Sequence, residues 1–101
     1  MRRRIRGGST FGAKMPTVFI PSLLRKYTGG QESIVVPGRT VGEVVRNLDR
    51  QFPGFRDQIV ENDDLKSSVA VSVDGDLAVG GLLEQVRDSS EIHFVPAIGG
   101  G

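Results

Sequence analysis

A single helix, expected over residues 41–52, constrains the fold of this chain more than any other feature. Thr40 and Glu43 have the spacing of a capping box, in which the Thr hydroxyl and the Glu carboxylate each accept a backbone N–H at the helix start. Pro53 and Gly54 end the pattern. Apolar residues recur at helical spacing on one face only, at Val41, Val44, Val45, Leu48 and Phe52. This apolar face must be buried, and we expect it to lie on a sheet formed by the rest of the chain.

Two short strands are expected before this helix. Residues 17–20 and 33–36 are rich in β-branched side chains, and each run is ended by a proline. The residues between them are too few for a crossover helix, which predicts an antiparallel hairpin with a wide loop. Val18 and Ile20 are expected to be the core pair of the first strand. The pattern of a short apolar strand does not determine which side chains point to the core and which to solvent, so the direction of the Phe19 side chain stays open.

Three further strands and a short helix are expected after the main helix. The sequence Asp74-Gly75 is a strong hairpin signal. The expected order is a polar connection over 56–68, strands over 69–73 and 76–81, a short helix over 82–86 and a last strand over 92–96. The prediction is an α+β chain with a mixed sheet of about five strands, one main helix and a short second helix. This is a β-grasp, or ubiquitin-like, arrangement.

Composition excludes several classes of chemistry. The chain has 101 residues, no cysteine and one histidine, His93. Disulfides, thiolate metal sites, persulfide chemistry and a cysteine nucleophile are therefore excluded, and we predict no metal site and no catalytic residue. A chain of this length buries only about 60% of its unfolded surface, which disfavours a deep internal active site. The sequence shows no apolar run of membrane-spanning length and no secretion signal, so we expect a cytoplasmic protein.

Charge divides the chain into three parts. Residues 1–14 hold five of the thirteen Lys and Arg residues and no acidic residue, which is typical of a flexible basic arm. Residues 15–96 form the predicted β-grasp domain, and residues 97–101 form a flexible glycine tail. The arm suits nonspecific contact with nucleic acid or anionic lipid. Because the rest of the chain offers no surface that combines aromatic and basic residues, we do not expect a nucleic-acid or membrane partner.

The tail Gly99-Gly100-Gly101 directly follows the last expected strand. Glycine has no Cβ, so Gly99 and Gly100 can thread a slot too narrow for any side chain. The free carboxylate of Gly101 is therefore the candidate reacting group. The alternative is an ordinary chain end with an inert tail on a binding module.

The quoted motifs together resemble the ThiS/MoaD family of sulfur carriers, and within it the actinobacterial carriers of cysteine synthesis. The resemblance covers residues 15–101. It is carried by residues 20–30, by the capped helix, by the turn at Val73-Asp74, and above all by Phe94-Val95-Pro96-Ala97-Ile98-Gly99-Gly100-Gly101. The position of Gly99 is more often Ala or Ser in that family.

The resemblance implies that the protein is a carrier and co-substrate, and not an enzyme. An E1-like adenylating and sulfurtransferase enzyme would use ATP to activate the Gly101 carboxylate, which sulfur would then convert to a thiocarboxylate. No bound cofactor is implied, and the free protein is expected to be a monomer. The implied sulfur acceptor is a pyridoxal-phosphate-dependent cysteine synthase. Molybdopterin, thiamine, tRNA thiolation, a secondary metabolite and ubiquitin-like protein modification stay open as alternatives.

Similar carriers dock their activating enzyme through apolar residues on the uncovered sheet face. If Ile92 and Phe94 point to the core, alternation sends the side chains of residues 93 and 95 outward beside the tail. The predicted docking residues are Phe19, Leu77, His93 and Val95. The alternative for each is ordinary surface exposure.

Overall fold

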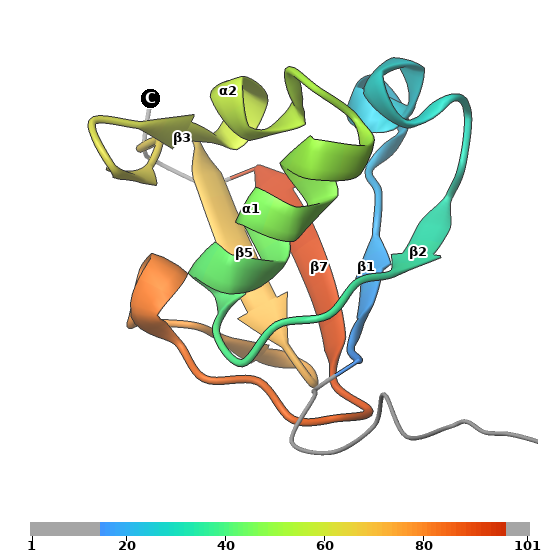
Figure 1. Cartoon of the computed structure of the whole chain (residues 1–101). Coiled ribbons are helices and arrows are strands. Elements are labelled where there is room, and N and C mark those ends of the chain that lie inside the picture. The colour runs from blue at the N-terminus through green and yellow to red at the C-terminus, as the bar shows by residue number, and fades with distance from the viewer. Residues whose placement is uncertain (1–14, 97–101) are drawn as a thin grey trace, which may run out of the picture.

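The computed structural model describes residues 15–96, so the predicted arm (1–14) and tail (97–101) lie outside the described part. Five strands form one mixed sheet in the order β2-β1-β7-β5-β6 (Figure 1). Their bounds are β1 Thr17–Phe19, β2 Ser33–Val35, β5 Val69–Val73, β6 Asp76–Leu77 and β7 Glu91–Pro96. The expected hairpin is confirmed, because β1 and β2 pair antiparallel. The last strand, β7, lies in the centre of the sheet, parallel to β1 and antiparallel to β5.

Helix α1 (Val41–Gln51) crosses one face of this sheet, as Figure 1 shows. The predicted capping box is present: the Thr40 hydroxyl accepts from the Glu43 N–H at 3.1 Å. The Glu43 carboxylate accepts from the Arg39 N–H at 2.9 Å, one residue before the cap. The helix therefore begins where the sequence predicts, and the Thr40 hydroxyl satisfies one of its exposed N–H groups, whereas the N–H that Glu43 accepts lies before the cap.

The core lies between α1 and the sheet. Four of the five predicted stripe residues of α1 are buried, while Phe52 at the helix end is half-buried. They meet buried side chains of the sheet region, namely Val18, Ile20, Val36, Val71, Ile92 and Phe94. Because a fully buried aliphatic side chain contributes about 1.5–3 kcal/mol, this layer is the main source of stability.

The expected polar connection over residues 56–68 is wrong in its details. It contains most of a short helix, α2 (Phe55–Ile59), and a two-stranded hairpin of β3 (Val60–Glu61) and β4 (Asp64–Leu65). Phe55 and Ile59 lie four residues apart, so both fall on one helical face, and both are buried. Asn62 and Asp63 adopt positive φ angles of 54° and 64°, which closes the hairpin with two residues of a type that tolerates this conformation.

Two other expectations differ from the structure. The link between β1 and β2 is a 3-10 helix, η3 (Ser22–Thr28), instead of a wide loop. It is stabilised by the buried Thr28, whose hydroxyl lies 3.1 Å from the Arg25 carbonyl and 3.0 Å from the Gln31 carbonyl. Strand β6 has two residues and does not extend to residue 81.

The second helix is also shorter than expected. A 3-10 turn, η4 (Gly81–Leu83), replaces the helix expected over residues 82–86. The chain after this turn is extended because it pairs with the start of α1. The Val41 N–H donates to the Glu84 carbonyl, and the Val86 N–H donates to the Arg39 carbonyl, each at 2.9 Å.

Candidate functional site

The structure fixes the root of the predicted tail. Strand β7 ends at Pro96, which pairs with Val69 at the start of β5. Gly99, Gly100 and Gly101 lie outside the described residues, so their predicted roles stay predictions. The described part of β7 is the central strand of the sheet, and two of its last residues, Phe94 and Val95, line a pocket together with residues of α2 and η3.

Strand register brings three of the predicted docking residues into one row. Phe19 pairs with His93, His93 pairs with Ser72, and Ser72 pairs with Leu77. Directly paired residues point to the same face of a sheet. Because Val18 and Ile20 are buried beneath α1, this row lies on the face that α1 leaves uncovered. The facing of Phe19 is thereby settled as outward.

Phe19 and His93 form a stacked pair at the centre of this face. Their ring centroids are 4.5 Å apart, and their ring planes differ by 4°. The His93 Nε2 atom lies 3.9 Å from a carboxylate oxygen of Glu91, and 43% of the His93 side chain is exposed. The pair is therefore a flat, half-buried aromatic platform with an acidic group at its edge.

Two further predicted docking residues flank this platform. Leu77 is 68% exposed at the β6 edge, and Val95 is 38% exposed two residues beyond His93 on β7. Val35, which sequence reasoning missed, is 54% exposed on the same face, because it pairs with Thr17. The alternation of residues 33–36 could have predicted this, because Ile34 and Val36 are buried and Val35 between them must face the other side of the sheet. We call Phe19, Val35, Leu77, His93 and Val95 the docking face.

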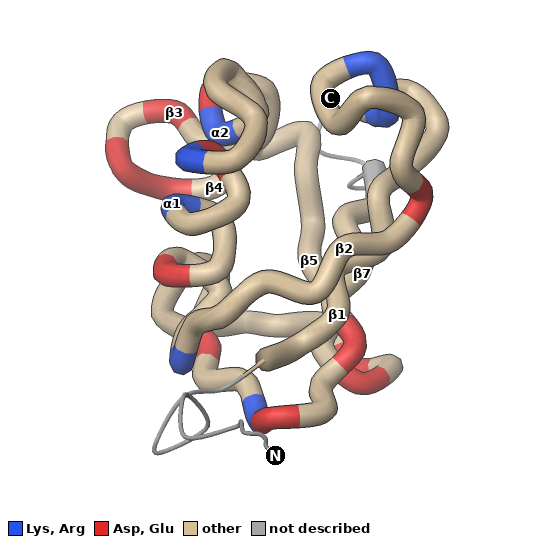
Figure 2. The backbone as a smooth tube through the Cα atoms, turned by 45° about the vertical axis from the view of Figure 1, so that its right-hand side comes forward, with Lys and Arg blue, Asp and Glu red and all other residues tan. Residues whose placement is uncertain are grey.

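Charge is sparse on the strands that carry this face. The five strands of this sheet hold no Lys or Arg, and Asp76 of β6 and Glu91 of β7 are their only acidic residues (Figure 2). Basic and acidic residues are found mainly on the helices and connecting segments, as Figure 2 shows. An apolar partner surface suits such a face better than a charged polymer does.

The start of β7 is held by Asp74, the turn residue between β5 and β6. Its carboxylate accepts from the Glu91 N–H at 2.9 Å and from the Ser90 hydroxyl at 2.8 Å. These hydrogen bonds, with a smaller contribution from the Arg87 charge, hold the pKa of Asp74 below its usual 3.8. Asp74 has a φ of 54° and Gly75 one of 90°, so the predicted tight turn is confirmed.

The described part of the chain contains neither a candidate metal site nor a membrane-spanning helix. Among residues 15–96, no group of three or more His, Cys, Asp or Glu side chains is placed to hold a metal ion. The same residues contain no helix long and apolar enough to span a membrane. The arrangement offers an apolar face beside a strand that leads into the tail, which suits a protein that is recognised and then acted on.

Comparison with known proteins agrees with this description. Residues 18–101 match the model of the ThiS family. The sulfur carrier protein CysO of Mycobacterium tuberculosis is 33% identical over 90 residues, which cover 84% of this chain and 97% of that protein. A chain of the Amycolatopsis orientalis BexX/CysO complex superposes with a TM-score of 0.79 at 32% identity, covering 85% of this chain and 99% of that one.

The fold comparison extends further. The small archaeal modifier protein 1 of Methanosarcina acetivorans shares the fold with a TM-score of 0.73 at 24% identity, over 88% of this chain and 98% of that one. The predicted β-grasp arrangement is thus confirmed. The family match and the similarity to CysO confirm the expectation of a carrier-type protein instead of a catalyst. With the family match spanning the domain and the glycine tail alike, this chain belongs to the ThiS family.

Proposed function

We propose that this chain is a sulfur carrier whose C-terminal carboxylate, on Gly101, is converted to a thiocarboxylate that donates sulfur in the biosynthesis of cysteine. The observation that carries the proposal is that the family match runs through the glycine tail to residue 101, directly after the central strand. The similarity to CysO supports the sulfur chemistry and favours cysteine as the product.

The chemistry requires activation because a carboxylate is a poor electrophile. An oxygen of the Gly101 carboxylate attacks the α-phosphorus of ATP, which forms an acyl-adenylate and releases pyrophosphate. Sulfide then attacks the acyl carbon, and AMP leaves with the original oxygen. If a persulfide attacks instead, the product is an acyl disulfide, and a second thiol must cleave its S–S bond, which releases the thiocarboxylate and a disulfide. The net change is one oxygen replaced by sulfur. ATP is a substrate of the activating enzyme in this scheme, and the carrier itself holds no cofactor.

Two partner enzymes are proposed. The first is an E1-like adenylating enzyme, which docks on the docking face while the glycine tail enters its active site. Phe19, Leu77, His93 and Val95 supply apolar contact for this step, with the Phe19–His93 stack at the centre. The second is the sulfur acceptor, proposed to be a pyridoxal-phosphate-dependent cysteine synthase.

Intact-mass measurement tests the proposal directly. The full chain is incubated with the adenylating enzyme of its own organism, ATP and a sulfide source. The expected result is a mass shift equal to the exchange of one oxygen for sulfur, located on the C-terminal peptide. Deleting Gly101 should abolish the shift and leave Tm unchanged. An unshifted mass in the presence of an enzyme that activates another carrier refutes the proposal.

Ubiquitin-like modification is the second candidate, because it uses the same activation and a similar fold. In that case the Gly101 acyl group is joined to a lysine amine, and no sulfur is retained. Recovery of this chain linked to lysine side chains after incubation with ATP and a cell extract favours modification. Transfer of the thiocarboxylate sulfur to a cysteine synthase product favours the carrier.

A further inference from the structure

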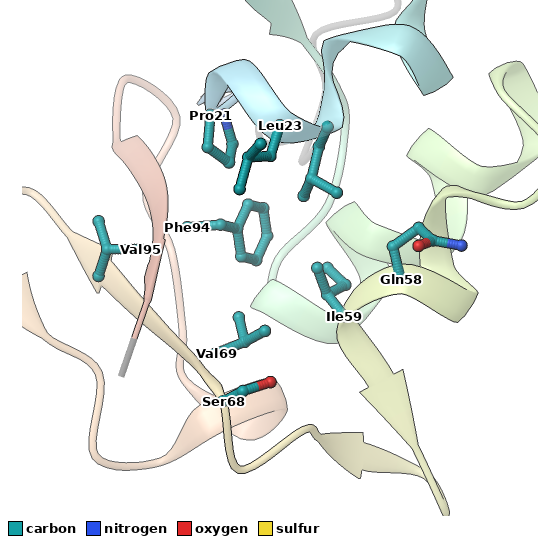
Figure 3. A pocket seen from close by; sticks show the side chains of 9 residues that line it. Pro21, Leu23, Gln58, Ile59, Ser68, Val69, Phe94 and Val95 are labelled. Carbon is teal, nitrogen blue, oxygen red and sulfur yellow. The ribbon is translucent and has the colours of Figure 1, made fainter. Parts of the chain in front are cut away.

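An apolar groove opens beside the last described residues of β7. Its walls include Leu23 and Leu24 of η3, Ile59 of α2, Val69 of β5 and Phe94 of β7. Figure 3 shows Phe94, Ile59 and Val69 turned toward the same space, and Val95 lines its edge. The groove has a volume of about 180 Å³. An enclosed apolar cavity of about 150 Å³ is enough to hold a benzene molecule, so this groove can take one aliphatic side chain.

The strand register relates the groove to the residues that follow. Val69 pairs with Pro96, so the end of β7 adjoins a groove wall. Alternate residues of an extended chain face the same side, so an extended continuation of β7 would place position 98 on the side of Phe94. Residue 98 lies two residues beyond Pro96, or about 7 Å along an extended chain. The side chain of Ile98 can therefore reach the groove.

The composition of the tail selects one occupant. Of residues 97–101, Ile98 alone has a large apolar side chain, since the others are one alanine and three glycines. Leu23 at the groove is 84% exposed, so the groove has apolar surface left to bury. The chain itself holds the Ile98 side chain at high effective concentration beside a groove that residues 15–96 leave open.

We propose that the groove is the docking site of Ile98 and that this contact anchors the root of the glycine tail. With Ile98 anchored, the projecting part of the tail is Gly99-Gly100-Gly101, about 10 Å of extended chain, in place of five residues spanning about 17 Å. The anchored tail loses less conformational freedom when a partner receives it. This consequence for threading rests on the proposed function, whereas the contact itself does not.

Methyl NMR on the full 101-residue chain tests the contact without any partner. A sample with labelled Ile δ1, Leu and Val methyl groups should show cross-relaxation between the Ile98 methyl and methyls of Leu24 or Val69. The Ile98→Val variant should keep contacts from position 98 to the same groove methyls. A random-coil shift for the Ile98 methyl with no contact to the groove overturns the proposal. A contact seen only between differently labelled copies in a mixed sample also overturns it, in favour of a second copy as occupant.

Stability measurements provide an independent arm. Ile98→Ser should lower Tm, and Ile98→Val should restore most of the loss. Val79→Ser is the matched control, because Val79 is 99% exposed and its replacement should leave Tm unchanged. An Ile98→Ser variant with the wild-type Tm overturns the proposal. If the wild-type chain shows the NMR contact but is never converted to a thiocarboxylate, the proposed function fails and the anchor stands.

Discussion

Replacing Leu77 with alanine should weaken docking of the activating enzyme without affecting the fold. Leu77 is 68% exposed, and full burial of a leucine side chain contributes about 1.5–3 kcal/mol. A partner can bury only the exposed part of the Leu77 side chain, and alanine keeps the Cβ atom. The substitution should therefore cost about 1–2 kcal/mol of binding free energy, which is about a 5- to 30-fold loss of affinity. We expect KM for the carrier to rise by this factor, with kcat unchanged because the reacting tail is untouched.

The assay is pyrophosphate release by the adenylating enzyme as a function of carrier concentration, with Tm measured on the same samples. Leu83→Ala is the matched control, since Leu83 is 83% exposed but lies beside Gly42 and Val45 of α1, on the covered side of the sheet. It removes the same atoms from a similarly exposed leucine. A wild-type KM for Leu77→Ala, or an equal rise in KM for Leu83→Ala, would refute the assignment of the docking face.

Three further predictions concern stability. Thr40→Ala should remove the cap of α1, costing about 1 kcal/mol and lowering Tm by about 4–8 °C in thermal unfolding. Phe55→Ala should cost about 3–5 kcal/mol in urea denaturation, because Phe55 is fully buried and meets Phe94 edge-on at 6.2 Å. Asp74→Asn keeps a residue type suited to positive φ but loses one accepting oxygen, so it should lower Tm at pH 7. Because the pKa of Asp74 is lower in the folded state, its charge stabilises the fold above the pKa of the unfolded chain, and this stabilisation is lost as pH falls through the folded pKa. The difference in Tm between Asp74→Asn and wild type should therefore shrink below about pH 4. A difference in Tm that stays constant with pH would contradict the charge argument.

The elements that the sequence predicts well are those with local causes. Helix α1 has its own cap at Thr40 and a stripe with a single period, so its position follows from neighbours within one turn. The β5–β6 turn likewise depends on two adjacent residues, Asp74 and Gly75. The buried hairpin pair Val18 and Ile20 follows from alternation once one face is covered.

The elements that the sequence misses depend on distant contacts or on weak local signals. The outward facing of Phe19 follows from its pairing with His93, a residue 74 positions away, which no short strand pattern contains. Helix α2 shows only Phe55 and Ile59 as an apolar pair within a polar stretch, too few for a periodic pattern. Val35 joins the docking face because β2 pairs with β1 in a particular register.

The position of β7 explains how a small domain can aim a narrow tail. A slip of β7 by one residue would send Ile92 and Phe94 to the open face and bury His93 beneath α1. Such a slip would break ladders with both β1 and β5, and also the hydrogen bond from the Glu91 N–H to the Asp74 carboxylate. The register of β7 up to Pro96 is therefore fixed by the sheet. The reach of the glycine segment depends instead on the number of residues that follow Ile98, so it can be altered without changing the contacts of the sheet.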